Sequence, residues 1–407
     1  MLDFAQIYKQ DYLKNTAFYD IISTKAVGPK APDHPVLRFI TSAVDTVLKQ
    51  KVQVKDIRKL RLQYISDVCG LLPALDKHKL WNYMLETAEG KKACRIWTAT
   101  DIIPAAAAMI GHTELLFKHV HIPRDILEPP CAILPSAITA AVVSGECNIL
   151  SDILKYLKRN LRGFQMTGSW DEMRVAAHRI GEALRCSVRL HKNAAAIAIF
   201  EFIAHYDAIA NSMPAKLGEQ LINDCFEHGN GDMAYACIVF DRNGIYCQDL
   251  HELQNSKAYR LKPYEERLLL RHGHKNVLQA LIKRGQFDPN ACQSSTSPLK
   301  FTLQKRRQDL ALVLLQNGVD IDAVPEGGDG KTVLWHAANE GWARDVKFLL
   351  EHGADPRIPG KPHKSVADAA FHSAACRYMI GRVLKEGNSN IDWKMIWEDY
   401  EQTRGWC

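Results

Sequence analysis

Basic side chains concentrate in one stretch of the chain, where their chemistry suits an anionic ligand. The basic and aromatic candidates for binding in this stretch are Trp170, Arg174, Arg179, Arg185, Arg189 and His191. A guanidinium can hold a phosphate or a carboxylate through two parallel hydrogen bonds, and an indole can stack on a base. The sequence leaves two interpretations open, which are an anion-binding surface and an ordinary solvated face of a helix.

Motifs of the common catalytic sites are missing from the sequence. It has no HExxH zinc motif, no GxSxG nucleophile motif and no GxxxxGK[ST] phosphate-binding loop. Residues 326–332, EGGDGKT, end like such a loop, but the spacing of their glycines is wrong. Glu201 and His205 lie four residues apart and would share one face of a helix, where we expect a surface pair. Whether the chain is an enzyme stays open.

The composition is that of a folded chain with a mild positive charge. Of its 407 residues 47% are hydrophobic and 24% are charged, which is typical of globular domains. The formal net charge of +6 permits an anionic partner without requiring one. The 11 cysteines are scattered singly, so we expect reduced thiols, no metal site and no cofactor. Reduced thiols also predict a place in the cytoplasm or nucleus. Because no apolar run is long enough to cross a bilayer, we expect no membrane partner.

The segment Gly330–Pro356, GKTVLWHAANEGWARDVKFLLEHGADP, has the pattern of two short helices. Leu349 and Leu350 belong to an apolar set at helical spacing. Gly341 suits a tight turn between helices, and Gly353 suits the left-handed position after the second one. The segment resembles the ankyrin repeat, whose consensus is roughly G-x-T-P-L-H-x-A-A-x-x-G-H-x-x-V-x-x-L-L-x-x-G-A-D-P.

Weaker copies of this pattern precede the segment. The glycines that end successive copies, Gly285, Gly318 and Gly353, lie 33 and 35 residues apart, close to the ankyrin period. Further upstream, Gly111 and Gly145 lie 34 residues apart. The sequence therefore predicts a series of repeats that are regular at the end of the chain and degenerate in its middle.

The same resemblance marks a second pair of candidate binding residues. Trp335 and His336 lie on the first helix of the best-matched repeat, near the concave groove that such repeats form. They are either a pair that contacts a ligand or ordinary structural residues of the repeat.

One such repeat buries only one face, so it is stable only in a stack. We therefore predict an all-α fold, an ankyrin-like helical-hairpin solenoid of about seven or eight degenerate repeats with a helical N-terminal cap. The predicted parts are an N-terminal helical region at 1–96, degenerate repeats at 97–263, regular repeats at 264–388 and a Trp-rich C-terminal helix at 389–407. Two polar insertions, at 162–174 and 240–263, are predicted to interrupt the stack.

The resemblance to ankyrin repeats implies a binding module. Its partner would be a protein or an anionic macromolecule, recognised through a basic, aromatic concave surface. The alternative hypothesis is an enzyme on the same scaffold, because in size and general character the chain is similar to the fungal arginine-containing cyclodipeptide synthases. That resemblance implies a tRNA partner, since these enzymes make a diketopiperazine from aminoacyl-tRNAs, and it implies acidic residues such as Asp171 and Glu172 that hold an arginine substrate.

Overall fold

The structure is a computed structural model that describes most of the chain beyond residue 98. The described residues are Val44, Asp45, Leu48, Lys59, Arg61 and Leu62, followed by 99–129, 135–167, 170–243, 260–291, 296–324, 329–360, 365–387 and 391–395. The predicted N-terminal helical region therefore lies outside the described residues apart from those six positions. Most of the predicted Trp-rich C-terminal helix lies outside them as well.

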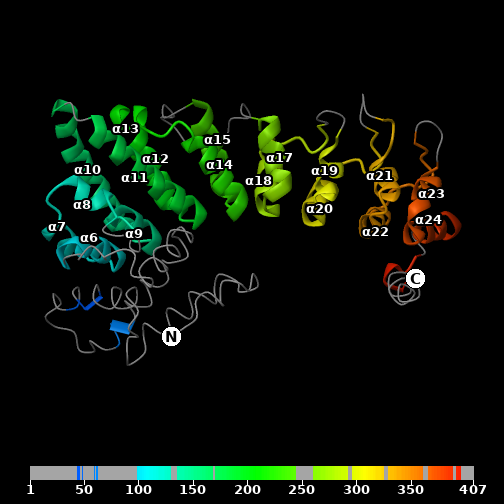
Figure 1. Cartoon of the computed structure of the whole chain (residues 1–407), viewed down its shortest axis with the longest axis horizontal. Coiled ribbons are helices and arrows are strands. Elements are labelled where there is room, and N and C mark those ends of the chain that lie inside the picture. Colours follow the sequence, from blue (N-terminus) through cyan, green and yellow to red (C-terminus); the bar gives the residue numbers. More distant parts are fainter. Residues whose placement is uncertain are drawn as a thin grey trace, which may run out of the picture. The chain divides into compact units, whose positions relative to one another are not determined.

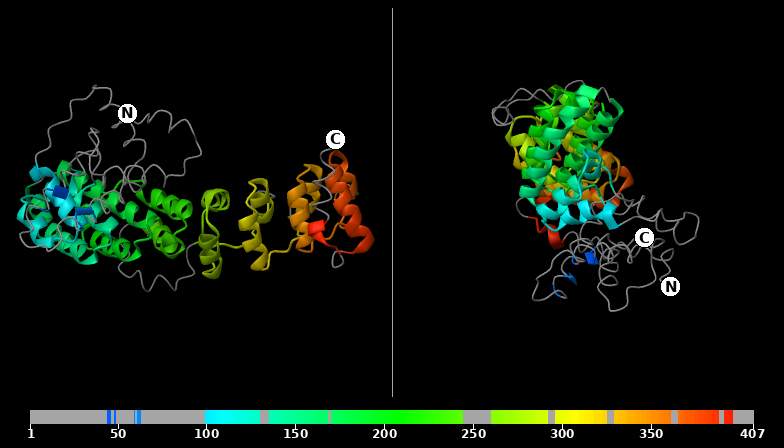
Figure 2. Two further views of the ribbon diagram at one scale, coloured as in Figure 1. Left: turned by 90° about the horizontal axis from the view of Figure 1, so that it is seen from below. Right: turned by 90° about the vertical axis from the view of Figure 1, so that its left-hand side faces the viewer.

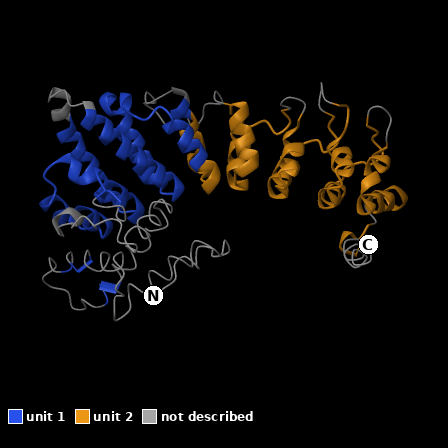
Figure 3. Ribbon diagram, in the orientation of Figure 1, with its two compact units in different colours: residues 1–224, 239–250 blue, residues 225–238, 251–407 orange. Residues whose placement is uncertain are grey.

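Helices and the turns between them make up the described part of the chain, and no β-strand occurs in it (Figure 1). The chain divides into two compact units (Figure 3). Unit 1 comprises residues 1–224 and 239–250, and unit 2 comprises residues 225–238 and 251–407. Within the same part of the chain, no helix is both long enough and apolar enough to span a membrane.

Unit 1 consists of helical hairpins, each with a first and a second helix. The hairpins are α6 (Ala99–Met109) with α7 (Thr113–Lys118), α9 (Ala137–Ser144) with α10 (Cys147–Thr167), and α11 (Trp170–Arg189) with α12 (Asn193–Ala204). The short helix α8 (Pro123–Leu127) lies between α7 and α9 in the sequence, and the short helix α13 (Asp207–Asn211) follows α12. Successive first helices pack together, because α6 contacts α9 and α9 contacts α11. A further hairpin, α14 (Leu217–His228) with α15 (Gly231–Asn243), contributes residues to both units.

Unit 2 repeats the same arrangement without helices as long as α10 and α11 (Figure 2). Its hairpins are α17 (Pro263–His272) with α18 (Lys275–Lys283), α19 (Pro298–Gln304) with α20 (Gln308–Gln316), and α21 (Val333–Asn339) with α22 (Ala343–Glu351), followed by α23 (Val366–Ala369) and the 3-10 helix η2 (Ala370–His372) with α24 (Ala374–Glu386). First helices contact first helices and second helices contact second helices, as α17 does with α19 and α18 with α20. With those of unit 1 and α14–α15, the described residues contain eight hairpins. The predicted all-α fold of stacked hairpins is confirmed.

The best-matched repeat folds as its sequence predicts. Ala337 and Ala338 on α21 are 1% and 0% exposed, so the first helix can approach its neighbours closely. Leu349 and Leu350 on α22 are fully buried and form the core of the hairpin. The hydroxyl of Thr332 accepts a hydrogen bond from the amide of Trp335 and caps the first helix. These contacts explain why this repeat keeps the clearest sequence pattern.

The prediction of an insertion at residues 162–174 is wrong. Helix α10 continues to Thr167 and α11 begins at Trp170, so residues 162–174 mostly extend two long helices rather than form a loop. Apolar side chains at helical spacing on α11, such as Met173 and Ile180, are buried and stabilise this extension by packing. In the second predicted insertion, α15 continues to Asn243, and residues 244–259 lie outside the described residues.

Candidate interaction surface on the first helices

Two of the predicted arginines meet on one buried carboxylate in unit 1. Asp224 on α14 has a side chain that is 4% exposed. Arg185 on α11 donates from Nε to Asp224 Oδ2 at 2.7 Å and from Nη2 to Oδ1 at 3.2 Å. Arg189, one turn later, donates from Nε to Oδ1 at 2.8 Å. This cluster, Arg185–Asp224–Arg189, joins the two first helices and carries one positive charge in excess.

The other predicted residues of α11 do not join this cluster. Arg179 instead pairs with Glu182 on the same helix, with 2.7 Å between Nη1 and Oε2. His191 is exposed in the turn after α11, where its φ is 57°. Arg174 is exposed near the start of α11. Trp170 is the first residue of that helix, and its side chain lies outside the described residues.

The two acidic candidates lie at the opposite end of α11 from the arginine cluster. Asp171 and Glu172 are exposed in its first turn, where carboxylates stabilise the partial positive charge of a helix N-terminus. Fourteen residues of α-helix, from Asp171 to Arg185, span about 20 Å. The helix therefore does not bring the acidic and the clustered basic residues into one pocket.

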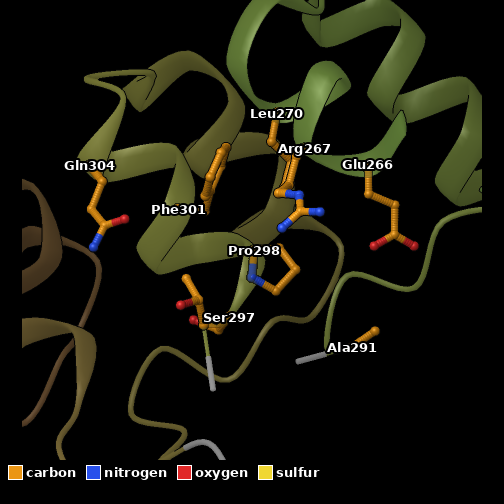
Figure 4. Close-up of a pocket in the computed structure, with 9 residues that line it drawn as sticks. Glu266, Arg267, Leu270, Ala291, Ser297, Pro298, Phe301 and Gln304 are labelled. Atoms are coloured by element: carbon orange, nitrogen blue, oxygen red, sulfur yellow. The ribbon is translucent and has the colours of Figure 1, made fainter. Parts of the chain in front are cut away.

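A pocket of about 210 Å³ lies between α17 and α19 in unit 2 (Figure 4). Leu270, Pro298 and Phe301 give it apolar walls, and Arg267 lies beside Phe301. The residues that line its two ends in Figure 4 are Glu266 and Gln304. The pocket thus combines apolar walls with charged and amide groups, which is the usual composition of a binding site.

Glu266 occupies a position that leucine holds in the next two repeats. Glu266, Leu299 and Leu334 are spaced by the same 33 and 35 residues as the glycines that end these repeats. Leu299 is 1% and Leu334 is 0% exposed, while Glu266 is half-buried. Loss of solvation on burial, with a smaller effect of the Asp288 carboxylate, raises the pKa of Glu266 to about 7. The first helix therefore places a carboxylic acid where the fold favours an apolar side chain.

The far side of α19 carries a second polar cluster. Lys300 Nζ lies 2.9 Å from His336 Nε2, and Asp329 Oδ1 lies 3.2 Å from the same nitrogen. Burial lowers the pKa of His336 below its usual value, and the charge of Lys300 lowers it further against the opposing effect of Asp329. We infer that His336 is neutral at pH 7 and accepts a hydrogen bond from the Lys300 ammonium group.

This cluster gives a titration prediction. We expect Lys300→Met to raise the pKa of His336, because the substitution removes a positive charge and leaves Asp329 to favour the imidazolium form. The test is an NMR pH titration of the His336 ring in the full chain, with Lys347→Met on α22 as the control. An unchanged or lower pKa in the Lys300 variant would show that the two side chains do not interact.

The same cluster links protonation to stability. The pKa of His336 is lower in the folded chain than the value of about 6.5 expected in the unfolded chain, so the unfolded state binds the proton more readily. This side chain therefore contributes a loss of stability as the pH falls through about 6.5.

Trp335 and His336, which the sequence groups as one pair, have different environments. Trp335 is 6% exposed, with Lys331 Nζ 4.0 Å from its ring centroid. Gly360 lies so close that a Cβ atom on it would be 2.8 Å from the indole Nε1. The indole is therefore packed in the repeat, and a ligand on this face would reach the imidazole of His336.

Comparison with known proteins identifies the repeat. Residues 329–361 match the family model of the ankyrin repeat. They form an ankyrin repeat. A stretch of 62 residues is 39% identical to the putative E3 ubiquitin-protein ligase XBAT34 of Arabidopsis thaliana, and it covers 15% of this chain and 16% of that protein. The chain thus matches about one sixth of the length of this curated relative.

A solved structure is also similar, at low identity. The ankyrin repeat domain of Bcl-3, a member of the IkappaB family, is 13% identical, with a TM-score of 0.27 and coverage of 69% of this chain and 97% of that one. The match to the family model supports the ankyrin-repeat character of residues 329–361. None of these matches supports the resemblance to cyclodipeptide synthases.

Sequence reasoning missed three features, which are Asp224 in unit 1 and, in unit 2, Glu266 and the pocket beside Phe301. The sequence does contain a signal for Glu266, since leucine stands at the equivalent position of the next two repeats. Asp224 had none, because its role depends on two arginines 35 and 39 residues away in the sequence. The described residues offer no candidate metal site, since they contain no group of three or more His, Cys, Asp or Glu side chains that could hold an ion.

Proposed function

We propose that the chain is a protein-interaction module that binds its partner through the first helices of unit 2. The observation that carries the proposal is the pocket between α17 and α19, whose apolar walls come from Leu270, Pro298 and Phe301. Ankyrin repeats serve as recognition modules, and their binding surfaces combine aromatic and charged groups. The polar cluster at His336 extends the same surface across α19 to α21.

A matched pair of variants within one repeat tests this proposal. Phe301 and Gln304 line the pocket on the first helix α19, while Leu312 and Gln316 are exposed on the second helix α20. We expect Phe301→Ala with Gln304→Ala to weaken partner binding at least 10-fold, because an aromatic anchor in a pocket carries much of the affinity of an interface. Leu312→Ala with Gln316→Ala should leave it unchanged.

The measurement is quantitative affinity capture with the full chain and both double variants, followed by a dissociation constant for the captured protein. Thermal unfolding of each variant shows that the comparison is made between folded proteins. Equal capture by the two double variants would contradict a binding surface on α19.

The finer hypotheses from the sequence gain less support. Asp224 neutralises one of the two arginines on which a basic surface in unit 1 depends, so that surface is a weaker basis for an anionic macromolecule. No observation favours a tRNA-dependent synthase, and we do not propose one. Tight binding of bulk tRNA at low salt that weakens steeply as salt is added would reopen that question.

A further inference from the structure

Glu266 is a carboxylate that the repeat does not neutralise. It stands in the register of Leu299 and Leu334, both of which are core residues. Within the described residues no ion pair joins its carboxylate to Arg260, Arg267 or Arg271, the three arginines nearest to it in the sequence. A half-buried carboxylate without a close counter-ion costs stability, so a position that breaks the pattern of its own repeat is a candidate for binding.

The walls of the pocket suit an aliphatic chain. Leu270, Pro298 and Phe301 line it between α17 and α19 (Figure 4). Long basic side chains bury their methylene groups against apolar surface while the charged end reaches a polar partner. The Phe301 ring already faces a cation, because Lys305 Nζ lies 5.5 Å from its centroid.

The charges around Glu266 favour a cation. The Asp288 and Glu265 carboxylates both make its negative charge less favourable, and Arg260 has the opposite effect. Arg267 also lines the pocket and its side chain is exposed, so a cation from a ligand would displace the Arg267 guanidinium toward solvent. An acidic ligand would add to the repulsion between Glu266 and its neighbouring carboxylates, whereas a basic ligand would relieve it.

We propose that this pocket is the subsite for a lysine or arginine side chain of the partner protein. The aliphatic part of that side chain lies against Phe301, Pro298 and Leu270, and its cationic end pairs with the Glu266 carboxylate. The inference rests on the proposed function, and it adds the chemistry of the residue that the partner inserts.

Such a subsite gives binding a defined pH dependence. The cation pairs with the ionised form of Glu266, whose pKa in the free protein is about 7. The ionised fraction rises from about one tenth at pH 6 to about nine tenths at pH 8, so affinity should increase about 10-fold between these values. The charges of Asp288, Glu265 and Arg260 act on Glu266 and Arg267 lines the same pocket, while the pKa of Glu266 lies in this window.

The test uses small probes and the full chain. N-acetyl-lysine-N-methylamide and N-acetyl-arginine-N-methylamide are titrated at pH 6 and pH 8 while NMR follows the backbone amides of Arg267 and Phe301. The corresponding leucine and glutamate amides are the control ligands. Glu266→Gln keeps the shape of the side chain, Glu266→Leu restores the residue found in the next two repeats, and Glu351→Gln on α22 is the control variant.

We expect saturable shifts with the two basic amides only. Binding should be about 10-fold tighter at pH 8 and at least 10-fold weaker in both Glu266 variants, with Glu351→Gln unchanged. Equal shifts from all four amides, or unchanged binding in Glu266→Gln, would overturn the assignment. If partner capture is lost in the α19 variant but basic amides show no preference, the proposed function stands and this inference fails.

Discussion

The substitution Asp224→Ala should lower the free energy of unfolding by about 2–4 kcal/mol, one of the two largest effects we expect. The carboxylate is 4% exposed and accepts three hydrogen bonds from two guanidinium groups. Removing it leaves Arg185 and Arg189 close together without their shared counter-ion, at the contact between α11 and α14. Because their side chains are 27% and 36% exposed, solvent screens part of the repulsion, and we place the effect below that of a fully buried pair.

The arginines should behave differently from the aspartate. Arg185→Ala or Arg189→Ala alone leaves the carboxylate with one partner, so each should cost about 1 kcal/mol. The double variant leaves Asp224 buried with neither arginine, and its cost should exceed the sum of the two single costs. Chemical denaturation of the full chain followed by circular dichroism measures all four values.

Glu182→Ala is the matched control for this series. It breaks a pair of similar length on the surface of the same helix, between Glu182 and Arg179, and such exposed pairs contribute less than about 1 kcal/mol. An effect of Asp224→Ala no larger than that of the control would show that the arginine cluster does not hold α11 and α14 together.

The end of the chain was predictable because its repeat depends on local signals. Thr332 caps a helix, Ala337 permits close packing and Gly341 makes the turn, each within its own hairpin. Apolar residues at helical spacing then identify the buried face without knowledge of the neighbouring hairpins. A repeat whose determinants are local can be recognised from one segment alone.

The repeats in the middle of the chain are difficult to recognise in the sequence for a physical reason. The tight turn between α11 and α12 uses His191 at a φ of 57°, and one turn of the more regular repeats, at Arg306 between α19 and α20, has the same backbone conformation. A glycine would mark such a turn in the sequence, whereas these side chains accept a conformational cost that neighbouring contacts must offset. The long helices α10 and α11 add a second difficulty, because packing overrides the loop-like composition of 162–174.

The candidate site, like the fold, was predictable from the sequence only in part. The sequence identifies Arg185 and Arg189 as a basic pair from their spacing on one helix, but not the carboxylate that holds them. It groups Trp335 with His336 because they are adjacent, while successive residues of a helix point in different directions. What a side chain faces across a helix contact depends on tertiary structure, which the spacing of residues in one helix does not determine.

The second large effect concerns Trp335, which we expect to be essential for packing. Trp335→Ala should lower the free energy of unfolding by about 3–5 kcal/mol, because it removes a buried indole from beneath Lys331 and beside Gly360. His336→Ala on the same helix should cost about 1 kcal/mol or less, since the imidazole is half-buried and its contacts are polar. Thermal and chemical unfolding of the full chain compare the two.

A conservative variant separates packing from ligand contact. The Trp335 Nε1–H group is buried and has no hydrogen-bond acceptor among the described residues, so Trp335→Phe loses no hydrogen bond and retains most of the apolar contact. We expect this variant to keep most of the stability and all of the partner affinity. If this variant instead keeps its stability but loses partner binding, the indole contacts the ligand directly. The binding surface would then extend into the position that we assign to the core of α21.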